Sequence, residues 1–276
     1  MVENNIKFLN NTSKSIRKKV IEMTAYVGGG HYSSSLCCVD ILISLYFNEM
    51  NVDPSNPSDP DRDRFILSKG HAAPGLYATL AEKGYFHSDE LLTLRQLNSR
   101  LQGHPVKSYN LPGLDSSSGS LGQGISVAVG IALAGKMNNK KYRVFVLLGD
   151  GECQEGQVWE AAMSAAHYEL DNLVVIIDNN KLQSTGSIDD IMSLGDISSC
   201  WKSLGWNIIE INGHNFDELL NAYKFANESK NKPTLIVANT VKGCGIPFIE
   251  DKIEYHTKPL TEEELQEGIL YLEGRY

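Results

Sequence analysis

The stretch from Tyr142 to Leu182 constrains the fold more than any other part of this sequence, because it holds two buried strands with a helix between them. Val144 to Leu148 and Leu173 to Ile177 are continuous apolar runs of strand length, which is typical of strands buried on both faces of a sheet. A strand, helix and strand of this length closes as a right-handed crossover, so the two strands run parallel. Their carboxyl ends therefore finish at the same edge of the sheet.

Small and polar residues follow both strands at this edge. The turn Gly149, Asp150 and Gly151 comes directly after the first strand, and Asn179 and Asn180 come after the second. Carboxylate and carbonyl oxygens are ligands that Mg²⁺ takes from proteins, while water and phosphate oxygens complete its shell. The glycines let a phosphate approach the backbone closely. Either turn alone is usually only a turn or a cap, but the two together predict a metal-bridged diphosphate.

Composition narrows the class of protein. The 276 residues carry a formal net charge of −9, which argues against nucleic-acid or anionic-membrane partners, because both are bound through clustered Lys and Arg. The basic run from Arg17 to Lys19 is interpreted as a solvated helix face. The odd number of cysteines, the lack of a signal peptide and the lack of a long apolar run predict a cytoplasmic protein with reduced thiols.

Periodicity and turn signals locate the other elements. Helices are expected over 12–27, 36–47, 72–83, 121–137 and 215–227, with a short helix over 88–97 that Ser88 caps. Further strands are expected over 65–68, 206–211 and 234–240, and irregular structure over 101–118 and 188–200. The small residues of 121–137 predict a closely packed, buried helix, with a contact between subunits as one setting for it. Residues 1–276 are thus expected to form one α/β domain with a doubly wound, mainly parallel sheet of about five strands flanked by helices.

Four of the seven histidines directly follow a glycine at a junction between elements, namely His31, His71, His104 and His214. Loop histidines suit proton transfer or hydrogen bonding to hydroxyl groups, because their charge changes near neutral pH. Each one alone is more often a satisfied loop residue. For His214 the capping-box spacing of Asn215 and Glu218 favours a helix entry.

Long segments around the remaining three histidines resemble the transketolase family of thiamine diphosphate enzymes. The segments are GGGHYSSSL, DRDRFILSKGHAAPGLYATL, LQGHPVKSYNLPGLDSSSGSLGQGISVAVGIA, the stretch from Tyr142 to Leu182, TVKGCG and EYHTKPL. They occur in that family's order and spacing, and the resemblance runs from about residue 12 to residue 262. It implies the diphosphate-binding domain of the thiamine diphosphate-binding fold.

The resemblance implies a role for individual residues. The ligands of Mg²⁺, for which Ca²⁺ or Mn²⁺ could substitute, would be Asp150, Asn180 and the backbone carbonyl of Leu182. Contacts to thiamine diphosphate would come from Ser34, His71, Gly119, Ser120, Leu121, Gly151, Asn180, Lys242 and His256. The residues that contact the sugar and move protons would be His31, His104 and His256. Glu155 and Glu160 match acidic positions at the family's dimer interface, although a solvated helix face is nearly as good an interpretation.

The implied reaction moves a two-carbon ketol unit from a ketose phosphate to an aldose phosphate, as in the pentose phosphate pathway. Two positions depart from the family pattern, Tyr32 where Pro is common and Thr257 where Gly is common, and both are expected to retune the donor or phosphate pocket. The pyrimidine-binding and C-terminal domains of the family, with the cofactor-activating Glu, have no counterpart here. We therefore expect the N-terminal subunit of a split transketolase, active with a separate C-terminal subunit in an α2β2 assembly.

Other interpretations stay open. The chain could serve a split transketolase-like enzyme for an unusual sugar, or be the α-type subunit of a 2-oxo acid dehydrogenase, although the three Gly-His motifs favour a transketolase. From another class, it could be a non-catalytic cofactor-binding or scaffold subunit that keeps the fold but has lost turnover. The intact Asp150, Asn180 and histidines argue against that loss.

Overall fold

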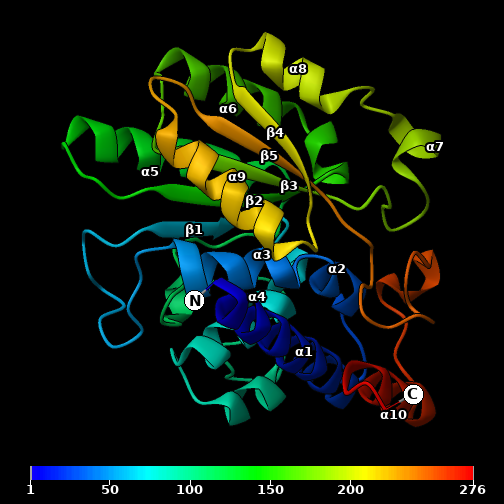
Figure 1. Cartoon of the computed structure of the whole chain (residues 1–276). Helices are drawn as coiled ribbons and strands as arrows, with labels where there is room; N and C mark the ends of the chain where they lie inside the picture. Colours follow the sequence, from blue (N-terminus) through cyan, green and yellow to red (C-terminus); the bar gives the residue numbers. More distant parts are fainter. Residues whose placement is uncertain (1, 276) are drawn as a thin grey trace.

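The five strands of the computed structural model, which describes residues 2–275, form a wholly parallel sheet in the order β1-β2-β3-β5-β4 (Figure 1). The strands are β1 (Arg64–Leu67), β2 (Val144–Gly149), β3 (Leu173–Asn179), β4 (Asn207–Asn212) and β5 (Thr234–Asn239). The expected doubly wound α/β fold with about five strands is confirmed.

Two helical layers cover the two faces of this sheet (Figure 1). One layer contains α1 (Val2–Tyr26), α3 (Val39–Ser44), α4 (Ala73–Lys83) and α9 (Phe216–Glu228), and the other contains α5 (Gln123–Met137), α6 (Gly156–His167) and α8 (Ile197–Ser203). Successive strand residues face opposite layers: Phe145 and Leu147 join the first core, and Val146 and Leu148 the second. This double burial explains the uninterrupted apolar strand sequences.

The remaining elements are short segments at the ends and edges. They include the helices α2 (Tyr32–Leu36), α7 (Ile188–Met192) and α10 (Glu262–Leu272). A π-helical turn covers Leu45–Glu49. Single 3₁₀ turns cover Gly70–Ala72, Ser88–Thr93, Lys107–Tyr109, Gly151–Gln154 and Ile253–His256. Among residues 2–275, no helix combines the length and the apolar character that crossing a bilayer would need.

Several predicted boundaries were wrong. The helix expected over 36–47 is divided, because the chain turns at Cys37 and Cys38 between α2 and α3. The short helix after Phe86 is a 3₁₀ turn in which the side chain of His87, rather than that of Ser88, caps the N–H of Asp89. The stretch 188–200, expected to be irregular, contains α7 and begins α8, each with a polar N-cap, Ser187 or Asp196. Helix α1 begins well before Thr12, because Leu9 already belongs to the core.

Helix α5 is only half buried in this chain. Its inner face packs through Ile125, Ala128 and Ala132, but Val127 and Met137 on the outer face are 40% and 74% exposed. The expectation of a buried helix therefore holds for one face only. The small residues allow the inner face to approach the sheet closely: at Gly124 an added Cβ would lie 2.7 Å from the Ser68 Cα.

The basic run from Arg17 to Lys19 is not a wholly solvated face. Arg17 is buried, and its guanidinium donates to both carboxylate oxygens of Asp40 in α3, at 2.9 and 2.7 Å. Lys18 and Lys19 do lie toward solvent, where they pair with Glu273 and Glu82. The expectation was wrong for Arg17 because the 100° step between helical residues turns it toward α3.

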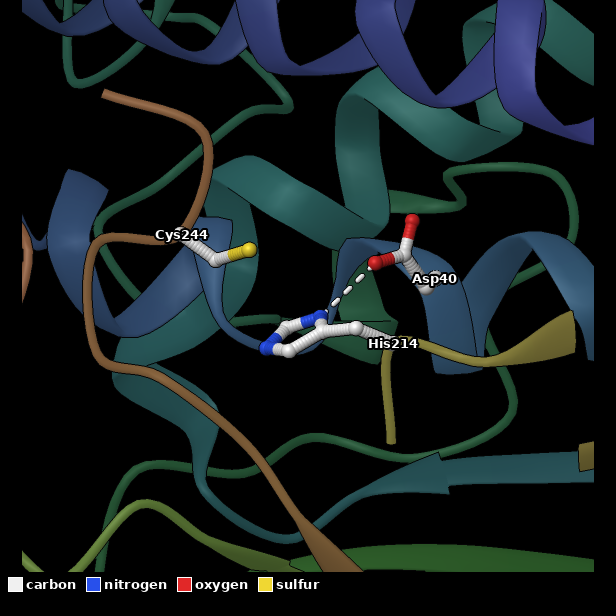
Figure 2. A group of neighbouring side chains, drawn as sticks. All are labelled: Asp40, His214 and Cys244. Atoms are coloured by element: carbon white, nitrogen blue, oxygen red, sulfur yellow. Dashed lines mark hydrogen bonds and ion pairs between the residues drawn. The ribbon is translucent and has the colours of Figure 1, made fainter. Parts of the chain in front are cut away.

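Asp40 also anchors the loops that follow β4 and β5. Figure 2 shows Asp40, His214 and Cys244 pointing toward one another, a grouping that could in principle hold a metal ion. However, His214 Nδ1 donates to Asp40 at 2.8 Å, and Nε2 accepts the backbone N–H of Val241 at 2.9 Å. Both ring nitrogens are therefore used, and Asp40 is neutralised by Arg17. Asn215 caps α9 as predicted, and the hydrogen bond from His214 to Asp40 joins the start of this helix to α3.

Candidate functional site

One cavity of about 270 Å³ lies at the carboxyl edge of the sheet. It brings together His31, Ser34, His71, His104, Gly119, Leu121, Asp150, Gly151, Asn180, Leu182, Lys242 and His256. Ser120 is exposed and does not line this cavity. Ser34 lies in α2, and the segments that carry the other residues follow β1, β2, β3 and β5 or precede α2 and α5, so strand ends and helix starts converge on one place.

One end of the cavity gathers oxygen atoms that suit a cation. The register pairs Gly149 with Asp178, which places Asp150 beside the Asn179–Asn180 turn. Asp150 is 5% exposed, and its carboxylate accepts the backbone N–H groups of Gly151, at 2.8 Å, and of Lys181. Burial and the nearby Asp178 carboxylate raise the pKa of Asp150 to about 6. A buried carboxylate that no Lys or Arg of residues 2–275 pairs with is suited to bind a metal ion.

Asn180 and Leu182 complete the oxygen set at this end. Asn180 is 8% exposed, and its side-chain oxygen accepts the N–H of Leu182 at 3.1 Å. The carbonyl groups of Leu182 and Gln183 accept Lys242 Nζ at 3.1 and 3.0 Å. One carboxylate, one amide oxygen and one carbonyl therefore lie within a single turn and its neighbour, with a buried ammonium beside them. This donor set fits a hard divalent cation with an anionic ligand.

A buried ion pair lies next to Asn180 at this end of the cavity, and the sequence analysis did not predict it. Lys69 and Asp178 are 1% and 0% exposed and form an ion pair. Asp178 Oδ1 also accepts from the Thr240 hydroxyl, and Oδ2 accepts from Cys37 Sγ and, at 3.4 Å, from Asn180 Nδ2. Lys69 lies in the segment DRDRFILSKGHAAPGLYATL, directly before Gly70, and that position was its only signal. The pair fixes the strand end that carries Asn180.

Glu152 was also missed, although it lies two residues after Asp150. Its buried carboxylate accepts the N–H groups of Gly122 and Gly149, at 2.9 and 3.0 Å, and the hydroxyl of Ser68. Burial raises the pKa of Glu152. These bonds tie the Gly-Asp-Gly turn to the start of α5 and the end of β1, so Glu152, which also lines the cavity, holds these segments together.

The other end of the cavity is a cluster of four histidines. The His31 ring centroid lies 5.3 Å from that of His71, 6.3 Å from His104 and 5.1 Å from His256. Burial, aided by nearby cations, lowers the pKa of His31 to about 4 and that of His256 to about 3. The pKa values of His71 and His104 are lowered as well, mainly by burial. All four rings are therefore neutral near pH 7, and each offers one nitrogen that can accept a proton.

Ser34 and Tyr32 hold the segment that carries His256. Ser34 Oγ lies 3.3 Å from His256 Nδ1. Tyr32 is 1% exposed, and its hydroxyl donates to the carbonyl of Lys258 at 2.7 Å. His31 thus faces the cavity, while Tyr32 faces the core. The hydrogen bond of Tyr32 holds the loop at Lys258, two residues beyond His256, and we call this contact the clamp. Thr257 is exposed, and its carbonyl would lie 3.4 Å from a Cβ on Gly29.

We expect Tyr32→Phe to loosen this segment. The Lys258 carbonyl loses its partner, which costs about 1 kcal/mol of unfolding free energy for an ordinary hydrogen bond. Amide hydrogen exchange should become faster over residues 253–258, measured by mass spectrometry. The control is Tyr223→Phe, which removes another hydroxyl of the same core, on α9, where it is bonded to Ser44 instead of to the segment of His256. Unchanged exchange around His256 in the Tyr32 variant would contradict the clamp.

Known proteins share this sequence and geometry over nearly the whole chain. The family model described as transketolase, thiamine diphosphate binding domain, matches residues 9–269. An apulose-4-phosphate transketolase subunit of Phocaeicola vulgatus is 38% identical over 257 residues, covering 93% of this chain and 91% of that protein. The 6-deoxy-6-sulfo-D-fructose transketolase subunit SqwG of Clostridium sp. (strain MSTE9) is 42% identical over 265 residues, covering 96% of both.

Longer relatives match over part of their length. Human transketolase is 42% identical over 256 residues, covering 92% of this chain and 40% of the human protein. The crystal structure of transketolase from Campylobacter jejuni has a TM-score of 0.91 at 31% identity, covering 97% of this chain and 43% of that one. The chain thus spans less than half the length of these two proteins and nearly the full length of the two bacterial subunits.

Proposed function

The chain belongs to the transketolase family, and we propose that it is the diphosphate-binding subunit of a thiamine diphosphate-dependent transketolase made of two chains. One observation carries the proposal: a single cavity joins the oxygen set of Asp150, Asn180 and Leu182 to four neutral histidines. An anchor for a metal and a diphosphate thus lies beside groups that exchange protons. Residues 1–276 would form one such domain, working in the cytoplasm.

The residues present fit the expected cofactor. Asp150, Asn180 and the Leu182 carbonyl would hold Mg²⁺, or Ca²⁺ or Mn²⁺ in its place, and Lys242 would give a compact positive charge to the diphosphate. Gly151 offers a backbone without a side chain at the turn, and an added Cβ would lie 2.9 Å from the Gln183 side chain. Contacts along the rest of the cofactor would come from Ser34, His71, Gly119, Leu121 and His256. Ser120 is the one proposed contact that lies outside the cavity.

The chain's own contribution to ketol transfer would be orientation and proton movement. The cofactor, when bound, supplies the nucleophilic carbon and the electron sink that ketol transfer requires. His31, His104 and His256 are neutral near pH 7, so a ring nitrogen of each can accept a proton from a sugar hydroxyl and return it. The His31 ring lies between the other two, with its centroid 6.3 Å from that of His104 and 5.1 Å from that of His256, and this packing restricts how the rings can turn.

The sugar is proposed to be a ketose that carries an anionic group. The two subunits that match this chain over most of their length are named for apulose 4-phosphate and for 6-deoxy-6-sulfo-D-fructose. Both names indicate a ketose with a tetrahedral oxyanion, and neither indicates a common pentose phosphate. A split transketolase for such a sugar is therefore the form of the proposal that we favour over one limited to the pentose phosphate pathway.

A separate C-terminal subunit would complete the site. The relatives named as subunits favour a second chain that supplies the activating carboxylate and the aminopyrimidine contacts. The outer face of α5 and the neighbouring Met163 of α6, which is 53% exposed, offer an apolar surface for self-association. The small residue Gly130 has open space beside it on that face. An α2β2 assembly would cover this surface, with Glu155 and Glu160 beside it.

Purified chain is expected to show no ketol transfer alone and to gain it with a C-terminal transketolase subunit from the same organism. The reason is that one chain supplies the diphosphate anchor and the other the activating group. The assay supplies a ketose phosphate as donor and an aldose phosphate as acceptor, and follows the aldose phosphate, two carbons shorter, that the donor becomes. Full activity of the single chain would contradict the two-chain form. Calorimetry gives the control: no metal-dependent binding of thiamine diphosphate, with or without the partner, would favour a non-catalytic scaffold.

A further inference from the structure

Arg95 lies next to the histidine cluster, on the loop that follows the Ser88–Thr93 turn. A second cavity of about 150 Å³ is lined by Arg95 together with His31, His71 and His104, which it shares with the main cavity. Gly30, Pro74, Leu94 and Gly103 form its remaining walls. The small cavity therefore extends the site beyond the histidines, away from Asp150, which lines only the main one of these two.

The guanidinium of Arg95 is almost free of protein partners. Its one side-chain hydrogen bond in the described chain goes to the carbonyl of Gly29, at a long 3.4 Å, and no Asp or Glu of residues 2–275 pairs with it. Arg100, five residues later on the same loop, instead forms a two-bond pair with Glu90, at 2.8 and 2.7 Å. Arg95 thus keeps most of its five N–H donors available for a ligand.

The backbone at Arg95 is held in an unusual conformation. Its φ is 60°, in the left-handed region that side-chain-bearing residues rarely adopt. The Arg95 N–H donates to the Leu101 carbonyl at 2.7 Å, and the side-chain stem lies against Gly103. Strain of this kind persists where surrounding contacts impose it, often beside ligands. Here it places the side chain between the loops that carry His31 and His104.

The charges around this cavity suit an anion. Lys69 and Lys242 lie at the main cavity beyond His31 and His71, and the histidines themselves are neutral near pH 7. No carboxylate lines the small cavity among the described residues. A planar guanidinium matches a tetrahedral oxyanion through two parallel N–H bonds. The side chain is exposed, so a substrate can reach it from solvent.

We propose that Arg95 binds the phosphate or sulfonate group of the sugar substrate, with the cavity beside His31 and His104 as its subsite. This inference rests on the proposed ketol transfer, since His31 and His104 are the residues assigned to the sugar there. It adds an oxyanion contact from this subunit to those that the partner chain would supply.

The test compares the two-chain holoenzyme carrying Arg95→Gln with the wild type, using a ketose phosphate, a ketose sulfonate and an uncharged ketose as donors. Loss of a charged two-bond contact should lower kcat/KM for the anionic donor by about 10- to 100-fold, mostly through KM. The uncharged ketose should lose far less. The anionic donor with the larger loss of kcat/KM shows whether the subsite binds the phosphate or the sulfonate group. Gln keeps the same Cβ, so the backbone strain is unchanged.

Two matched variants make the outcome specific. Arg95→Lys keeps the charge and should recover part of the loss, whereas Arg100→Gln removes a cation from the same loop and should leave all three donors unaffected. Equal losses for charged and uncharged donors would mean that Arg95 only positions the loops, and no loss at all would also overturn the proposal.

A binding measurement separates this inference from the proposed function. If the wild-type holoenzyme transfers ketol units from none of the three donors, the proposed function fails, and Arg95 is then judged by calorimetry on the full chain with inorganic phosphate and with methanesulfonate. Binding of either anion that the Arg95→Gln variant loses, and the Arg100→Gln variant keeps, would still support the subsite. Equal binding by the wild type and the Arg95 variant, or no binding by the wild type, would overturn it.

Discussion

Asp150→Asn is expected to abolish metal-dependent binding of thiamine diphosphate to this chain. The substitution keeps the shape of the side chain but removes the one carboxylate of the oxygen set, whose other members are neutral. A divalent cation at this place would lose its only anionic protein ligand, and the diphosphate would lose the bridging metal. Calorimetry with thiamine diphosphate and Mg²⁺, on the chain with and without its partner, measures the loss.

The control for this variant is Asp189→Asn. Asp189 is exposed on α7 and lines a neighbouring cavity that Asp150 also lines. The substitution Asp189→Asn therefore removes the same charge from the same edge of the sheet. The effect of Asp189→Asn on cofactor binding should be small.

The pH dependence of cofactor binding gives a second test. Because burial and Asp178 raise the pKa of Asp150 to about 6, protons compete with the metal below that pH, and cofactor binding by the wild type should weaken there. Unchanged binding in Asp150→Asn would exclude Asp150 as a ligand.

The sheet and the oxygen set around Asp150 and Asn180 could be predicted because each depends on local sequence patterns. Continuous apolar runs identify doubly buried strands, and parallel strands must end at a common edge, so the neighbourhood of Asp150 and Asn180 follows from residue order alone. The Gly-His segments marked three members of the histidine cluster, whereas His256 came only from the family resemblance. The structure adds that the other three rings gather around His31, with centroids 5.1 to 6.3 Å from its own, which no sequence spacing specifies because the four residues come from four separate segments.

What escaped prediction depends on contacts between distant segments. The RKK run is polar in sequence, yet Arg17 is buried because Asp40 and the Cys244 carbonyl meet it from two other elements. Glu152 looks like an ordinary acidic turn residue until Ser68 and Gly122 are brought beside it by β1 and α5. Tyr32 stood out only as a departure from the family pattern, and its partner Lys258 lies 226 positions away. Partners so far apart in sequence leave no local periodicity or spacing to detect.

Lys69→Met is expected to be strongly destabilising, lowering the unfolding free energy by about 3 to 5 kcal/mol, since it leaves one member of a buried ion pair uncompensated. Met nearly fills the space of the lysine stem, so the loss reports the Asp178 charge rather than a cavity. Chemical denaturation of the full chain near pH 7 measures it. Lys19→Met, which breaks the more exposed pair with Glu82, is the control and should cost less than about 1 kcal/mol.

The pH dependence of this loss identifies its cause. In the wild type, burial opposes ionisation of Asp178, but the charge of Lys69 outweighs it and holds the pKa of Asp178 below its usual value. The wild-type pair therefore contributes stability above the unfolded-state pKa and loses it as the pH falls. Without Lys69, burial raises the pKa of Asp178, so the folded variant binds a proton more readily than the unfolded chain and gains stability relative to neutral pH. The difference in unfolding free energy between variant and wild type should consequently become smaller as the pH falls.

The double variant Lys69→Met with Asp178→Asn should recover part of the lost unfolding free energy at neutral pH. A difference in unfolding free energy that does not change with pH would mean that Lys69 stabilises the strand ends through packing alone.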